Sequence, residues 1–137
     1  MAGNQGKQAH DGGCLCGAIR YRLKSDPEWS GNCHCPSCVK ATGGAFSTWV
    51  GVKKENFEVI KGGIKICETS PGVERGFCGN CGSSLTCVIE KGWPGQVSVT
   101  ASTLDDPSLA KPTVDIWVST KMPWVKLDEA LKSFPEF

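Results

Sequence analysis

Apolar and polar residues alternate with a period of two along much of the chain. Ile19, Tyr21 and Leu23 alternate with Arg20 and Arg22, which is the pattern of a strand with one buried face. The same period recurs in six later segments, which we also predict as strands: 48–52, 57–59, 64–66, 85–89, 97–101 and 114–118. Many short strands of this kind indicate a mostly β fold.

Turn-forming residues separate these segments and leave little room for helix. The chain contains 17 glycines and 8 prolines, enough to interrupt every predicted strand. A short helix is predicted to begin at Pro36, because proline is favourable at a first helical position, and to end before Gly43. Further short helical turns are expected at 105–110 and at 128–133, before Pro135.

The length of 137 residues predicts one domain. We assign residues 1–11 to a flexible leader and 12–137 to the domain. No apolar run approaches the roughly 20 residues of a membrane helix, and residues 1–13 lack the apolar core of a signal peptide. We therefore expect a cytoplasmic protein. The formal net charge of +1 argues against binding to nucleic acid or acidic membranes, which require a basic excess.

Cysteine is the unusual feature of the composition. The chain has nine, an odd number, whereas secreted disulfide proteins usually have an even number and a signal peptide. In a reducing compartment, grouped cysteines are more often metal ligands or catalytic groups. Seven of the nine fall into three tight groups: Cys14 with Cys16, then Cys33 with Cys35 and Cys38, then Cys78 with Cys81.

The first and third groups together make a closed zinc site. Cys78 and Cys81 form a Cys-x-x-Cys turn with glycine at Gly79 and Gly82, which brings two sulfurs to one metal. Cys14 and Cys16 are two residues apart on an extended segment and therefore face the same side. Four thiolates complete a tetrahedral structural zinc. A redox role for the Cys78 and Cys81 pair is disfavoured, because no βαβ pattern surrounds it.

The middle group supplies three thiolates and leaves a fourth position open, which is the pattern of a catalytic zinc. His34 is expected to point away from the metal if Cys33 and Cys35 face it. A purely structural site closed by Cys67, Cys87 or His34 remains an alternative. Cys67 and Cys87 stand alone, and we interpret both as plain buried residues; Cys87 alternates with Leu85 and Ile89.

These motifs resemble the glutathione-dependent formaldehyde-activating enzyme family, also called the GFA or centromere protein V domain. The resemblance rests on three segments, 13–21, 33–38 and 77–83, and on Thr103 to Pro107 and Trp117 to Trp124. It implies a β-tent fold of folded antiparallel sheets with zinc-binding cysteine knuckles. It also implies two zinc ions per chain: a structural one on Cys14, Cys16, Cys78 and Cys81, and a catalytic one on Cys33, Cys35 and Cys38.

The function expected from this pattern is carbon–sulfur lyase chemistry. A thiol that coordinates zinc is deprotonated, so the open position suits a thiol substrate. We expect the partner to be a small molecule: glutathione or a glutathione conjugate such as S-hydroxymethylglutathione. Its carboxylates require cationic or backbone donors, for which the candidates are Arg20, Lys40, Lys53, Lys54, Arg75 and Lys121. The alternative is a non-catalytic zinc module that binds a protein. The sequence does not predict the oligomeric state.

Overall fold

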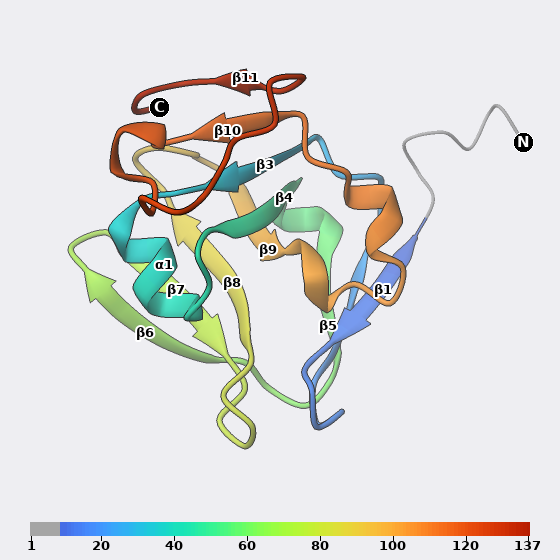
Figure 1. The fold of residues 1–137 in the computed structure, drawn as a ribbon. Coiled ribbons are helices and arrows are strands. Elements are labelled where there is room, and N and C mark those ends of the chain that lie inside the picture. Colours follow the sequence, from blue (N-terminus) through green and yellow to red (C-terminus); the bar gives the residue numbers. More distant parts are fainter. Residues whose placement is uncertain (1–8) are drawn as a thin grey trace, which may run out of the picture.

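The computed structural model describes residues 9–137. They form two β-sheets and one α-helix, α1 (Pro36–Thr42) (Figure 1). The smaller sheet has three strands in the order β1-β2-β5, with bounds β1 His10–Gly13, β2 Arg20–Leu23 and β5 Phe57–Lys61. Single 3₁₀ turns, among them η4 (Pro107–Ala110) and η5 (Val118–Thr120), connect later strands.

The larger sheet has eight strands in the order β11-β10-β3-β4-β9-β8-β7-β6. Their bounds are β3 Trp29–Cys33, β4 Ser47–Lys53, β6 Lys65–Ser70, β7 Val73–Phe77, β8 Ser84–Ile89, β9 Gln96–Thr100, β10 Val114–Ile116 and β11 Lys132–Ser133. Most pairs are antiparallel, but β10 runs parallel to both β3 and β11. The strand β10 therefore lies between β3, from the first third of the chain, and β11, near the C-terminus (Figure 1).

Alternation along the strands divides the buried side chains into two clusters. On β4, Val50 and Val52 belong to the larger cluster, whereas Trp49 belongs to a second one. The larger cluster joins the two sheets, because it also contains Tyr21 and Leu23 of β2. The second cluster surrounds cysteines of the middle group and is described below. A strand of the large sheet that contributes residues to both clusters thus has the larger core on one face and the candidate site on the other.

This architecture confirms the predicted mostly β fold of folded sheets with cysteine knuckles. Each predicted strand is present, and α1 lies where Pro36 and Gly43 predicted it. The sequence pattern did not reveal four further strands, β1, β3, β7 and β11. The segment predicted as a helical turn at 128–133 is instead a turn followed by β11.

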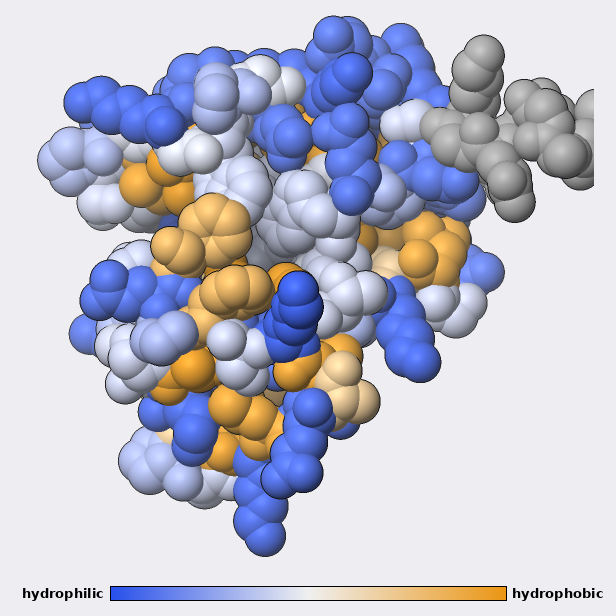
Figure 2. All heavy atoms as spheres, turned by 90° about the horizontal axis from the view of Figure 1, so that it is seen from above, coloured by the Kyte–Doolittle hydropathy of each residue, from blue (hydrophilic) through white to orange (hydrophobic). Residues whose placement is uncertain are grey.

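The strand β1 begins at His10, inside the segment assigned to a leader, while residues 1–8 lie outside the described part. Within residues 9–137 no helix is long and apolar enough to cross a membrane. Apolar residues reach the surface in separate patches bordered by polar ones in the view of Figure 2.

Candidate metal centres

The first and third cysteine groups meet although they are far apart in the chain. The sulfurs of Cys14, Cys16, Cys78 and Cys81 all lie within 4.8 Å of one another. The Sγ of Cys16 is 3.6 Å from that of Cys14 and 3.8 Å from that of Cys78. Four thiolates bound at about 2.3 Å around a tetrahedral ion would be about 3.8 Å apart. The spacing of this four-cysteine group therefore fits a metal ion.

Backbone amides around these sulfurs favour the thiolate form. The amides of Asn80 and Cys81 each donate to Cys78 Sγ at 3.4 Å, and the amide of Ile19 donates to Cys14 Sγ at 3.2 Å. The hydrogen bond with Ser83 lowers the pKa of Cys81 to about 5. Donors that point at a sulfur stabilise its negative charge, as a metal ligand requires.

The middle group is brought together by a strand, a loop and a helix. Cys33 ends β3, Cys35 precedes α1, and Cys38 lies in its first turn. The Sγ of Cys35 caps α1 by accepting a hydrogen bond from the Cys38 amide at 3.4 Å. Gly43, with a φ of 79°, ends the helix in the left-handed conformation that glycine adopts without strain. All three sulfurs lie within 4.8 Å of one another.

The surroundings of the middle group act differently on its three sulfurs. Hydrogen bonds from the thiols of Cys33 and Cys38 lower the pKa of Cys35 well below that of an ordinary thiol, and the nearby charge of Arg75 lowers it further. Hydrogen bonds with Cys35 and Cys38 raise the pKa of Cys33. Of the three sulfurs, Cys35 is the one whose surroundings most favour the thiolate form.

His34 is turned away from the three sulfurs, as the alternation predicted. Its Nε2 donates to Asp115 Oδ1 at 2.9 Å, and its ring is almost completely buried. Asn32 donates to the same carboxylate oxygen at 3.1 Å, and the His34 amide donates to the Ile116 carbonyl at 3.0 Å. The parallel strand β10 thus holds the loop that carries Cys33 and Cys35.

A second set of side chains covers the middle group. Trp49, Cys87 and Trp117 belong to the same cluster as Cys33 and Cys38. Trp117 has a φ of 58°, and it is the only residue other than glycine with a positive φ among residues 9–137. Cys87 is buried, as predicted, and burial raises its pKa to about 11. It is not among the three sulfurs that could share a metal ion.

Arg75 is the cation that contacts the middle group. It lies on β7 opposite Cys87 of β8, and its Nη2 donates to Cys38 Sγ at 3.7 Å. Burial alone would lower the pKa of Arg75, but the nearby sulfurs of Cys87, Cys38 and Cys35 raise it. Arg75 was one of six cations proposed from the sequence, and its place follows from strand pairing rather than from any local motif.

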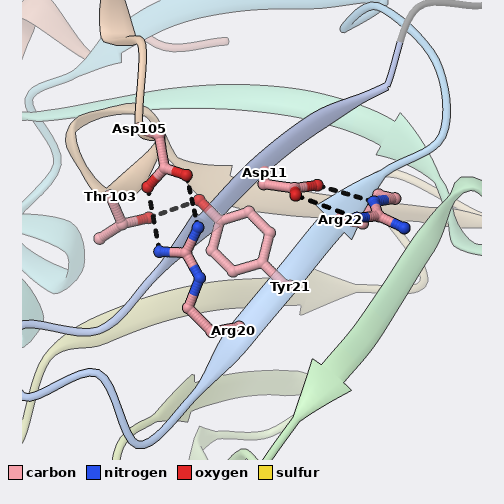
Figure 3. Close-up of polar contacts among 6 residues, drawn as sticks. All are labelled: Asp11, Arg20, Tyr21, Arg22, Thr103 and Asp105. Atoms are coloured by element: carbon pink, nitrogen blue, oxygen red, sulfur yellow. Dashed lines mark hydrogen bonds and ion pairs between the residues drawn. The ribbon is translucent and has the colours of Figure 1, made fainter.

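Three other predicted cations are engaged elsewhere. Arg20 forms an ion pair with Asp105 at the small sheet (Figure 3), and Lys54 forms one with Glu90. Lys121 Nζ donates to the Val125 carbonyl. The prediction that Cys67 is buried was wrong: it is exposed, because β6 is the edge strand of the large sheet and all six of its residues are exposed.

Comparison with known proteins settles the family. Residues 9–120 match the glutathione-dependent formaldehyde-activating enzyme family. A Halomonas elongata protein named "Putative glutathione-dependent formaldehyde-activating enzyme" is 33% identical over 129 residues, which cover 86% of this chain and 80% of that protein. The chain belongs to the glutathione-dependent formaldehyde-activating enzyme family. A crystal structure of a Rhodobacter sphaeroides protein shares the fold of this family member, with a TM-score of 0.58, 18% identity, and coverage of 74% of this chain and 96% of that one.

Proposed function

We propose that this protein is a zinc-dependent carbon–sulfur lyase that acts on glutathione adducts of the S-hydroxymethylglutathione type or on a related thiol conjugate. The family to which the chain belongs is named for glutathione-dependent activation of formaldehyde. In the direction of adduct formation, the thiol sulfur bonds to the carbonyl carbon and the thiol proton ends on the carbonyl oxygen. Cleavage reverses both changes, so no oxidant or reductant is required.

The observation that carries this proposal is the incomplete ligand set of the middle group. Cys33, Cys35 and Cys38 could share an ion, and within residues 9–137 no fourth histidine, cysteine or carboxylate joins them. Of the alternative fourth ligands, His34 is held by Asp115, and Cys67 and Cys87 lie outside the group. A three-ligand zinc site with an open position is a catalytic arrangement, whereas four protein ligands make a structural one.

The two groups would hold different zinc ions for different purposes. Cys14, Cys16, Cys78 and Cys81 would bind a structural ion that ties the β1–β2 connection to the β7–β8 connection. Cys33, Cys35 and Cys38 would bind a catalytic ion, which supplies a thiolate form of the bound thiol and stabilises it when the carbon–sulfur bond breaks. The chain's own contribution is to orient the three sulfurs through α1 and β10, and to enclose them with Trp49 and Trp117.

Paired serine variants test this division of roles. Cys35→Ser should remain folded, retain one zinc per chain and lose lyase activity. Cys81→Ser should lose the fold, because structural zinc contributes on the order of 10 kcal/mol or more and the whole domain is stable by about 5–15 kcal/mol. Circular dichroism, metal analysis and an NMR assay of S-hydroxymethylglutathione formation give the three readouts. An active Cys35→Ser variant would exclude the middle group as the catalytic centre.

Two measurements on the unmodified protein separate the lyase from a non-catalytic zinc module. Protein purified without chelator should contain close to two zinc ions per chain, whereas one ion would favour the module. Calorimetric titration of the zinc-loaded protein with glutathione should give binding, with S-methylglutathione as the matched control that lacks a free thiol. Equal affinity for both would show that the sulfur does not reach the open position.

A further inference from the structure

Arg75 is a buried cation that has no carboxylate partner. Its side chain is 6% exposed, and none of the ion pairs formed within residues 9–137 involves it. A buried charge without a counter-charge costs several kcal/mol. The groups that interact with the charge of Arg75 are sulfurs: Cys38, which its Nη2 contacts at 3.7 Å, and Cys35 and Cys87. The fold therefore places this guanidinium against the middle group alone.

Strand pairing explains why Arg75 points at these sulfurs. Arg75 is directly opposite Cys87 on β8, and Val73 is opposite Ile89. Residues paired in this way share one face of the sheet, and Val73, Cys87 and Ile89 all belong to the cluster around Cys33 and Cys38. The contact between Arg75 and Cys38 is thus fixed by the register of the sheet.

The net charge of the metal site indicates the role of Arg75. A divalent ion on three thiolates has a net charge of −1, which the guanidinium of Arg75 cancels. A thiolate added at the open position brings the charge of the ion and its ligands to −2, and with Arg75 the total is −1. The cation therefore selectively stabilises the state in which an anionic sulfur is bound, and it does nothing comparable for a neutral ligand.

Arg75 also has an unused donor. Its Nη1 is buried and has no hydrogen-bond partner, whereas its Nη2 is bound to Cys38. Buried donors are nearly always paired, and an unpaired one costs about 1–3 kcal/mol. The two nitrogens share one guanidinium carbon, so Nη1 lies beside the nitrogen that contacts Cys38. A bound anionic ligand would satisfy it.

We propose that Arg75 is the residue that selects an anionic thiolate as the fourth ligand of the middle group. Nη2 holds Cys38, and Nη1 donates to the sulfur of the incoming thiol. This role rests on the proposed function in that the middle group binds a divalent metal and an external thiol. It does not depend on glutathione, because the peptide part of the substrate takes no part in it.

The test uses cobalt(II)-substituted protein and two small ligands. The thiol 2-mercaptoethanol becomes an anionic ligand, whereas imidazole binds as a neutral one; thiolate-to-cobalt absorption and the cobalt d–d bands report the two affinities. Arg75→Gln should weaken 2-mercaptoethanol binding by about 10- to 100-fold, the range for a hydrogen bond to a charged group, and change imidazole binding by less than about 3-fold. Arg75→Lys, which keeps the charge, should recover most of the loss.

Controls keep this inference separate from the proposed function. Arg22→Gln is the matched variant, because Arg22 pairs with Asp11 on the small sheet (Figure 3) and should leave both affinities unchanged. Equal losses for both ligands in Arg75→Gln, or no loss for the thiol, would overturn the role of Arg75. A protein that binds 2-mercaptoethanol in this way but does not form S-hydroxymethylglutathione would retain the role of Arg75 and lose the lyase assignment.

Discussion

Replacing Asp115 by alanine should destabilise the protein and loosen the loop that carries the middle cysteines. The carboxylate is 2% exposed and accepts hydrogen bonds from His34 at 2.9 Å and from Asn32 at 3.1 Å. Both donors are themselves buried. The substitution removes both bonds and leaves two buried donors without this acceptor.

The size of the effect follows from these two donors. A buried donor left without an acceptor costs about 1–3 kcal/mol, so Asp115→Ala should lower the free energy of unfolding by about 2–6 kcal/mol. That is a large share of the 5–15 kcal/mol typical of a domain. Both donors bond Oδ1, so Asp115→Asn retains that acceptor oxygen, loses only the negative charge, and should lose less.

Urea unfolding of the zinc-loaded protein measures this loss. With a denaturant dependence of about 2 kcal/mol per molar, the midpoint of Asp115→Ala should fall by about 1–3 M. Cobalt titration of the same variant should show weaker binding to the middle group than to the four-cysteine group. Glu129→Ala, at an exposed position, is the control and should stay within about 0.5 kcal/mol. A loss below about 1 kcal/mol in Asp115→Ala would refute the reasoning.

Three further predictions concern the core and the metal. Leu85 is fully buried, so Leu85→Ala should lower the free energy of unfolding by about 2–5 kcal/mol, as measured by calorimetry; a smaller loss would contradict its place in the core. Burial raises the pKa of Tyr21 to about 12, so the folded state holds the phenol proton more tightly than the unfolded chain does. The resulting contribution to the free energy of unfolding is complete below about pH 10 and is lost as the pH rises towards 12. Tyr21→Phe loses the hydrogen bond with Thr103 and should be about 1 kcal/mol less stable than the unmodified protein at neutral pH, but more stable above about pH 11; parallel pH curves in urea would exclude this. A strong chelator should abolish lyase activity before it unfolds the protein, because the three-ligand site is open and the four-ligand site is closed; simultaneous loss by activity assay and circular dichroism would contradict the division.

The sequence predicted those parts of the fold that local patterns specify. Alternation identified β2 and β4, because their buried residues are large and apolar. It did not identify β3, where Ser30, Gly31 and Asn32 have no strand-like side chains. This strand forms because β4 and β10 pair with it on either side, a tertiary effect that overrides weak local preference.

The candidate site was likewise predicted only in part from the sequence. The cysteines are grouped by spacing in the chain, so their partition could be made before the structure. Arg75 could not be selected from six cations, since it lies 37 residues from Cys38 and reaches it only through the register of β7 and β8. The burial predicted for Cys67 failed for a related reason: alternation does not reveal whether a strand lies at the edge of its sheet.

The parallel pairing of β10 with β3 also bears on how the protein matures during synthesis. Asp115 follows His34 by 81 residues, so at about 5–20 residues per second a ribosome takes roughly 4–16 seconds to deliver it. During that interval, the nascent chain carries three closely spaced thiols without the strand that later encloses them. To avoid oxidation before folding is complete, these three thiols would need to bind a metal ion early or to be kept reduced by other thiols.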